Sequence, residues 1–73
     1  MIVKRSVSIR GHPTSISIED EFWTELKSLA TESGRPLANL VAAIDADRTS
    51  GQNLSSAIRV FVLRRLIESR DSA

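Results

Sequence analysis

The chain of 73 residues is long enough for one small domain, and its apolar share of 41% is typical of a chain that folds. It contains no cysteine, which excludes disulfides and cysteine-bound zinc as supports for a thin core and leaves self-association as the remaining candidate. Ten basic and nine acidic residues give a net charge of +1, so total charge alone does not indicate a nucleic-acid-binding protein.

Two short strands are predicted at the start of the chain. Apolar and polar residues alternate over residues 3–10, which is the period of a half-buried strand. Residues 11–13 have the composition of a turn, because glycine permits positive φ and proline lacks an N–H. Residues 14–18 alternate again, with Ser15 and Ser17 on the polar side, and they predict a second strand.

Three helices are predicted after the strands, over about residues 19–33, 36–47 and 53–69. The spacing of apolar residues changes to threes and fours after Ile18, and acidic residues occupy the first turn, where they favour a helix start. Gly34 is expected to end the first helix, Pro36 to open the second, and Asn53 to cap the third.

The third predicted helix carries apolar side chains nearly all round its axis. Such a helix must be buried, and a chain this small cannot cover it alone. We therefore expect a dimer interface that includes this helix. The apolar residues concerned are Ile58, Val60, Phe61, Val62, Leu63, Leu66 and Ile67.

Charge is distributed unevenly. The first fourteen residues carry +3, residues 15–34 carry −4, and the residues after 50 carry +2. Basic ends therefore flank an acidic middle. No apolar run approaches the ~18 residues of a membrane span, and nothing resembles a signal peptide, so we expect a cytoplasmic protein without membrane contact.

No catalytic constellation is visible, which predicts a protein that is not an enzyme and needs no cofactor. His12 is the only histidine, and the acidic cluster at 19–21 is explained as a helix start. Asp45 and Asp47 lie near the predicted end of the second helix. We expect them to pair with Arg48 or with an arginine of the third helix, because two aspartates are too few oxygens for a metal site.

The strand over residues 14–18 is too short to satisfy its own edges. The same strand from two chains can pair antiparallel about a two-fold axis, with its isoleucines sealing a core built by both sets of helices. Such a two-stranded ribbon fits the DNA major groove, where outward side chains reach base edges.

On these residues the chain resembles the ribbon-helix-helix DNA-binding proteins of the Arc, CopG and MetJ type, which are dimeric bacterial and phage repressors and antitoxins. The resemblance is carried by Ser15-Ile16-Ser17-Ile18, by the apolar positions of the first two helices and by the Gly34 turn. Further segments look like a bacterial subgroup with an extra N-terminal strand and a third helix. They include Lys4-Arg5-Ser6-Val7, Gly11-His12, Phe22-Trp23, Ile44-Asp45 and Asn53-Leu54-Ser55-Ser56-Ala57.

The resemblance implies a fold that is mainly α with a short β-ribbon. Residues 1–73 would form one ribbon-helix-helix domain, whose two-stranded antiparallel sheet is shared between the chains of a homodimer. The N-terminal strand and the third helix would be added to it. The dimer core is expected to contain Ile16, Ile18, Phe22, Leu40, Ile44 and Phe61.

The resemblance also implies sequence-specific binding of double-stranded DNA by a transcriptional regulator such as a repressor. The family's base-contacting strand positions correspond to Pro13, Ser15 and Ser17, of which Pro13 offers no side-chain hydrogen bond. Pro36 removes one of the N–H donors that anchor a phosphate at the second helix. The expected DNA-binding residues are Ser15, Ser17, Arg10, Lys4, Arg5 and Arg35.

Two alternatives stay open from the sequence. Residues 3–10 either fold back onto the second strand, which would widen a shared sheet beyond the groove, or form a basic arm that strengthens DNA binding. The second open question is function, because an antitoxin-like or adaptor dimer that binds another protein, with no ribbon in DNA, also accounts for the apolar third helix.

Overall fold

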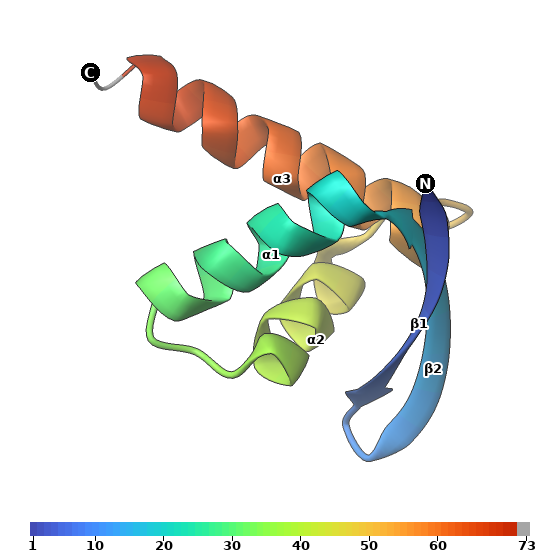
Figure 1. The fold of residues 1–73 in the computed structure, drawn as a ribbon. Coiled ribbons are helices and arrows are strands. Elements are labelled where there is room, and N and C mark those ends of the chain that lie inside the picture. Colours follow the sequence, from blue (N-terminus) through green and yellow to red (C-terminus); the bar gives the residue numbers. More distant parts are fainter. Residues whose placement is uncertain (72–73) are drawn as a thin grey trace.

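A computed structural model describes residues 1–71 of the chain. Two strands come first, β1 (Ile2–Ile9) and β2 (His12–Glu19), and three helices follow, α1 (Asp20–Glu32), α2 (Leu37–Asp47) and α3 (Leu54–Asp71). The strands form an antiparallel hairpin, and the helices lie on one side of it (Figure 1). β1 pairs with β2, so of the two alternatives left open by the sequence the folded-back strand is observed, and the basic arm is not.

The hairpin turn lies one residue earlier than the sequence indicated. Arg10 and Gly11 connect the strands, and both have positive φ, at 52° and 83°. Two central residues with positive φ define a type I′ turn, whose twist matches that of the flanking strands. His12 and Pro13, expected in the turn, therefore already belong to β2 and pair with Ile9 and Ser8.

Pro13 is tolerated inside β2 because of its place in the ladder. Hydrogen-bonded and non-hydrogen-bonded pairs alternate along antiparallel strands, and the turn joins Ile9 to His12. The next pair, Ser8 with Pro13, therefore falls at a non-hydrogen-bonded position. The missing N–H of Pro13 belongs to the outer edge of β2, so it costs the hairpin nothing.

The boundary between α1 and α2 follows the expected glycine signal. Gly34 has a φ of 68°, its N–H donates to Thr31 O at 3.1 Å, and the N–H of Arg35 donates to Ala30 O at 3.0 Å. These bonds satisfy the last carbonyls of α1 in a left-handed cap. Pro36 precedes α2 as its N-cap, whereas the sequence predicted it as the first residue of the helix.

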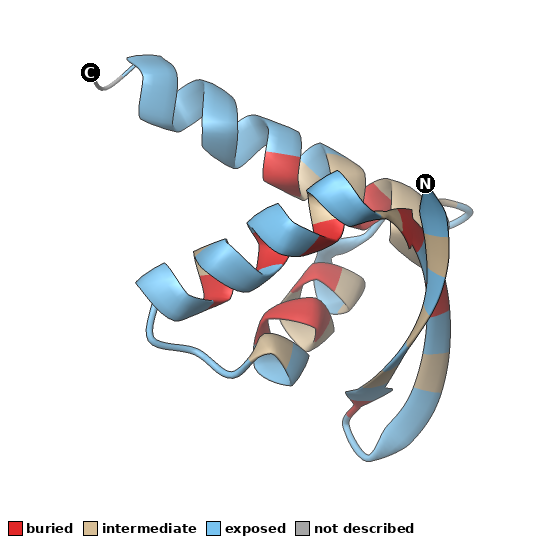
Figure 2. Cartoon of the chain, viewed as in Figure 1, coloured by how far each residue is buried: buried red, intermediate tan, exposed pale blue. Residues whose placement is uncertain are grey.

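The core lies between the inner face of the hairpin and the three helices (Figure 2). Ile16 and Ile18 of β2 are buried, and so is Trp23 of α1. The residues expected in a dimer core all lie in or against the core of one chain. Ile16, Ile18, Leu40 and Ile44 are buried there, while Phe22 and Phe61 are partly buried against it.

α3 is buried only along part of its length. Its start is capped as predicted, because the N–H of Ser56 donates to Asn53 Oδ1 at 2.7 Å. Every residue from Leu63 to Asp71 is exposed (Figure 2). One chain therefore leaves four large apolar side chains of this helix in water, with 37–53% of their surface exposed: Val60, Leu63, Leu66 and Ile67. No helix in the described part of the chain is long and apolar enough to cross a membrane.

Candidate nucleic-acid interface

The outer face of the hairpin is exposed and largely polar. Residues directly opposite each other in an antiparallel pair share a face, and three such pairs point away from the helices. They are Lys4 with Ser17, Ser6 with Ser15, and Ser8 with Pro13. All six residues are exposed, and together they form what we call the serine face: Lys4, Ser6, Ser8, Pro13, Ser15 and Ser17.

The inner face explains why the serines point outward. Side chains alternate along a strand, and Ile9, Ile16 and Ile18 are buried against the helices. Their neighbours in sequence must therefore face solvent. A slip of one residue in this register would expose the isoleucines and bury the serines, so the serine face is fixed by the core.

The chemistry of the serine face suits contact with a polar surface. Each serine hydroxyl is both a donor and an acceptor of hydrogen bonds, so it can meet base edges or phosphate oxygens. The side chains are short, which lets a partner approach the backbone of both strands. Lys4 adds one positive charge near the open end of the hairpin.

Arg10 stands at the opposite end of the hairpin, in the turn. It is the one non-glycine residue with positive φ within residues 1–71, and its side chain is exposed. Neither Arg10 nor Lys4 makes an ion pair in the described part of the chain. A strained position that keeps a cation at a loop tip points to use of that cation.

Arg5 lies on the opposite side of β1 from Lys4. Its guanidinium donates to Asp20 Oδ1 at 3.0 Å and lies 5.1 Å from the centre of the Trp23 ring. Its Nε atom is buried without a hydrogen-bond partner. Arg5 therefore holds the start of α1 against the hairpin and is not part of the serine face. The alternation that predicts the strand gives Arg5 the same side as Val3 and Val7, and this signal was available in the sequence.

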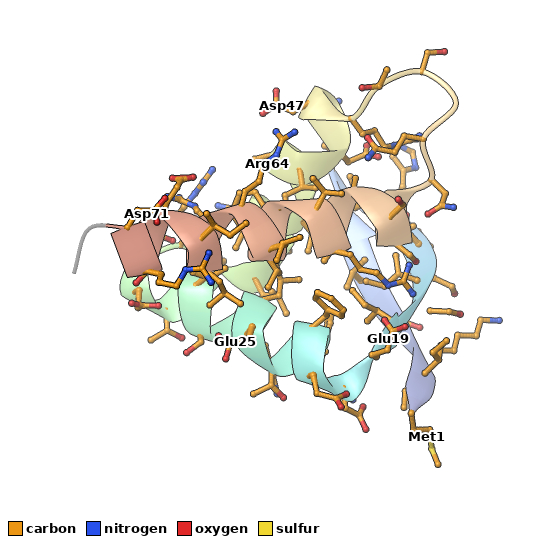
Figure 3. The ribbon with its side chains drawn as sticks, turned by 90° about the horizontal axis from the view of Figure 1, so that it is seen from above. Met1, Glu19, Glu25, Asp47, Arg64 and Asp71 are labelled. Carbon is orange, nitrogen blue, oxygen red and sulfur yellow. The ribbon has the colours of Figure 1, made fainter. Side chains whose placement is uncertain are left out.

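Arg35 belongs to a second basic group, away from the serine face. It lines a hollow of about 350 Å³ between α2 and α3, together with Arg48, Arg64 and Asp47. Figure 3 shows Arg64 extending from α3 toward the end of α2 that carries Asp47. Arg48 is held in place by Asp45 at 2.7 Å, which is the pairing expected for that aspartate.

Glu19 ties the end of β2 to α3. Its two carboxylate oxygens accept bonds from Arg59 Nε at 2.8 Å and Arg59 Nη2 at 3.3 Å. The hydrogen bond from Arg59 lowers the pKa of the Glu19 carboxyl below its ordinary value of 4.5. Figure 3 shows Glu19 between the starts of α1 and α3, close to Met1, whose carbonyl accepts the N–H of Asp20 at 3.2 Å.

This hairpin, followed by two helices across a glycine turn, is matched by a family model described as a ribbon-helix-helix domain, over residues 2–66. The chain belongs to the ribbon-helix-helix family. Members of this family are usually DNA-binding transcription regulators or antitoxins, generally form dimers, and have a non-enzymatic fold. No curated protein and no solved structure matches the chain.

The ribbon-helix-helix match includes β1 and most of α3 as well as β2, α1 and α2. The sheet of one chain is made by its own β1 and β2, so the strand expected to pair with its own copy already has one partner. Sequence reasoning named Ser15 and Ser17 as outward residues but missed Ser6 and Ser8. Their place across from Ser15 and Pro13 depends on the turn position, which was expected one residue later.

Within residues 1–71, no group of three or more histidine, cysteine, aspartate or glutamate side chains could hold a metal ion. By register the pair Ile2 with Glu19 continues the serine face, where Ile2 is exposed and the carboxylate of Glu19 is bonded to Arg59. The chemistry of the face is therefore hydrogen bonding and weak positive charge.

Proposed function

We propose that the protein is a homodimeric, sequence-specific DNA-binding protein that regulates transcription and reads the major groove with its β-ribbon. The observation that carries this proposal is the serine face, an exposed two-stranded surface of hydroxyl groups with an unpaired cation near each end. A two-stranded ribbon is one of the structures that enter the major groove.

The residues of the interface have separate roles in this proposal. Ser15 and Ser17 contact base edges, and serine discriminates less than the ~1–3 kcal/mol of a good bidentate contact. Lys4 and Arg10 contact phosphates, which gives affinity without sequence preference. Arg35 contributes positive charge from the start of α2, and Arg5 positions the hairpin by its bond to Asp20.

The test is an anisotropy titration of labelled duplexes drawn from a randomised pool, at salt between about 50 and 200 mM. Arg10→Asn should weaken binding to all duplexes and reduce the salt slope by about 1, because one phosphate contact is lost. Asparagine tolerates the left-handed backbone of this turn, so the hairpin stays intact. Ser17→Ala should leave the slope unchanged and alter the sequences recovered by selection.

The matched control is Arg70→Asn, which removes an exposed arginine at the far end of α3 (Figure 1). It should bind as the unmodified protein does. Duplex binding at low salt no stronger than that of a neutral control protein would reject the proposal. If Arg70→Asn and Arg10→Asn lost duplex affinity equally, Arg10 would contribute no more to DNA binding than an arginine outside the proposed interface.

One observation favours a second candidate function. Four large apolar side chains of α3 are exposed, and exposed apolar patches mark interaction sites. An antitoxin-like or adaptor dimer that binds another protein would use it. A plain dimer that remains dispersed when concentrated favours the first function, whereas aggregation that increases with concentration favours a missing protein partner.

A further inference from the structure

The hollow of about 350 Å³ between α2 and α3 has an apolar part and a cationic part. Leu40 and Ile44 of α2 line it and are buried in the core, and Phe61 lines it from α3. Its volume is at the lower end of the range found for small-molecule sites. We call it the arginine hollow, after three further residues of its lining: Arg35, Arg48 and Arg64.

The three arginines reach the arginine hollow from separate segments of the chain. Arg35 lies between α1 and α2, Arg48 follows α2, and Arg64 belongs to α3. Arg48 is held in place, because its guanidinium donates to Asp45 Oδ1 at 2.7 Å and to the carbonyl of Gln52 at 2.7 Å. The side chains of Arg35 and Arg64 make no hydrogen bond or ion pair with any described residue. Two guanidinium groups are therefore free to bind a partner from outside the chain.

The carboxylates around the arginine hollow do not neutralise these cations. Asp45 bonds to Arg48 and offsets its charge. Asp47 is the one acidic residue in the lining, and Figure 3 shows Arg64 extending from α3 toward it without an ion pair between them. Arg35 and Arg64 together outweigh Asp47, so the arginine hollow keeps a positive charge, which attracts anions.

The lining also restricts which anion fits. A guanidinium group matches a carboxylate or phosphate with two parallel hydrogen bonds. Small-molecule sites combine apolar walls with a few polar groups that fix the orientation of the ligand. An inorganic ion would satisfy the arginines and leave the apolar walls in water. A small acid with an aromatic or short acyl body would satisfy both parts.

From these observations we propose that the arginine hollow binds a small amphipathic carboxylate. The carboxylate bonds to Arg35 and Arg64, and the apolar body lies against the apolar lining of α2 and α3. No lining residue belongs to the hairpin, so this site is separate from the serine face. The inference goes beyond the proposed function and does not depend on it, because ligand binding is measured without DNA.

The first test compares an acid with a neutral molecule of the same shape. The isotope-labelled protein is titrated with naphthoate, with naphthamide and with inorganic phosphate, and its amide signals are followed by NMR. Naphthoate should bind at least about tenfold more tightly than naphthamide, which has no charge for the guanidinium groups. It should also bind at least about tenfold more tightly than phosphate, which has no apolar body.

The shifted signals should come from the lining of the arginine hollow. Shifts confined to other parts of the chain, or equal affinity for naphthoate and naphthamide, would overturn the proposal. If phosphate bound as tightly as naphthoate, the arginines would form a simple phosphate contact and the amphipathic site would be wrong.

The second test changes the charge of the lining in both directions. Arg64→Gln should weaken naphthoate binding by about tenfold, because a charge-assisted bond is lost. Asp47→Asn should strengthen it by about threefold, because repulsion by a nearby exposed carboxylate is removed. Arg70→Gln is the matched control on the far end of α3 and should bind as the unmodified protein does. All three positions are exposed, so the substitutions leave the core intact.

The third test fills the hollow and leaves every charge in place. Ala43 lines the arginine hollow from α2 and is half-buried. Ala43→Leu should weaken naphthoate binding by about tenfold, because the larger side chain occupies the space of the apolar body, and should leave phosphate binding unchanged. Urea denaturation confirms that the variant is folded. Unchanged naphthoate binding in Ala43→Leu, or equal losses in Arg64→Gln and Arg70→Gln, would place the ligand elsewhere and overturn the proposal.

Discussion

Glu19 and Arg59 connect residues forty positions apart in sequence, and their ion pair fixes how α3 lies on the hairpin. Both side chains are about one-third exposed, so solvent screens the pair and its contribution to stability is modest. Its geometry is more informative than its strength. The two oxygens of Glu19 meet two nitrogens of Arg59, which holds α3 at the end of the serine face that carries Lys4.

The lowered pKa of Glu19 predicts a specific acid sensitivity. The folded chain favours the ionised carboxylate because Arg59 donates hydrogen bonds to it. This stabilisation is complete above the ordinary pKa of 4.5 and is lost as the pH falls through the lower pKa of the folded state. Urea unfolding measured from neutral pH downward should therefore lose more stability in the unmodified protein than in Glu19→Gln.

The control for that prediction is Glu25→Gln, which removes an exposed carboxylate of α1 that lies away from Glu19 in Figure 3. Its acid dependence should match that of the unmodified protein. Identical acid dependence in Glu19→Gln and the unmodified protein would contradict the assignment of the shift to Arg59.

Among the elements, the hairpin turn decides the register and hence the serine face. Gly11 has a φ of 83° and open space around its Cα, so a side chain there is opposed by backbone strain alone. Gly11→Ala should lower the free energy of unfolding by about 1–2 kcal/mol. Arg10→Asn should raise it, because asparagine is the favoured partner of glycine in this turn.

Urea denaturation of the two variants checks this prediction, and the opposite signs at neighbouring positions serve as the control. The midpoint should shift in opposite directions while the slope stays constant. If Gly11→Ala left the free energy of unfolding unchanged, the turn would not be held in the type I′ geometry. A stabilised Arg10→Asn that binds DNA less well would show that Arg10 serves binding at the expense of folding.

For the strands and helices, the sequence predicted which elements exist more accurately than how they contact one another. Alternation gave both strands, and Gly34 and Asn53 marked helix ends that the structure confirms. The turn was misplaced because Gly11 and Pro13 both signal a turn, and only the pairing of Ile9 with His12 decides between them. The surroundings of Arg5 were harder to predict, because a cation on an apolar face looks like an interruption until Asp20 and Trp23 are seen beside it.

At the scale of the whole molecule, the main feature left open by a single chain is the exposed apolar side of α3. Val60, Leu63 and Ile67 follow one another at spacings of three and four, which is the pattern of a helix seam that packs on another helix. They are exposed, whereas Ile58 and Val62 on the other side are buried in the core. A two-fold contact through this seam would join two chains and cover these side chains.

This arrangement predicts that Leu63→Glu weakens the dimer. Burying one leucine side chain contributes about 1.5–3 kcal/mol, and two-fold symmetry brings two copies to the contact, so the dissociation constant should rise by at least about tenfold. Sedimentation equilibrium at several concentrations distinguishes the 8.0 kDa chain from its dimer.

Ser69→Glu is the matched control, because it places the same carboxylate on an exposed part of α3 that faces α1 across a hollow lined by Leu29 and Glu32. It should dimerise as the unmodified protein does. If Leu63→Glu dimerised equally well, the two-fold contact would lie elsewhere, and the free outer edge of β2 would become the leading candidate despite Pro13.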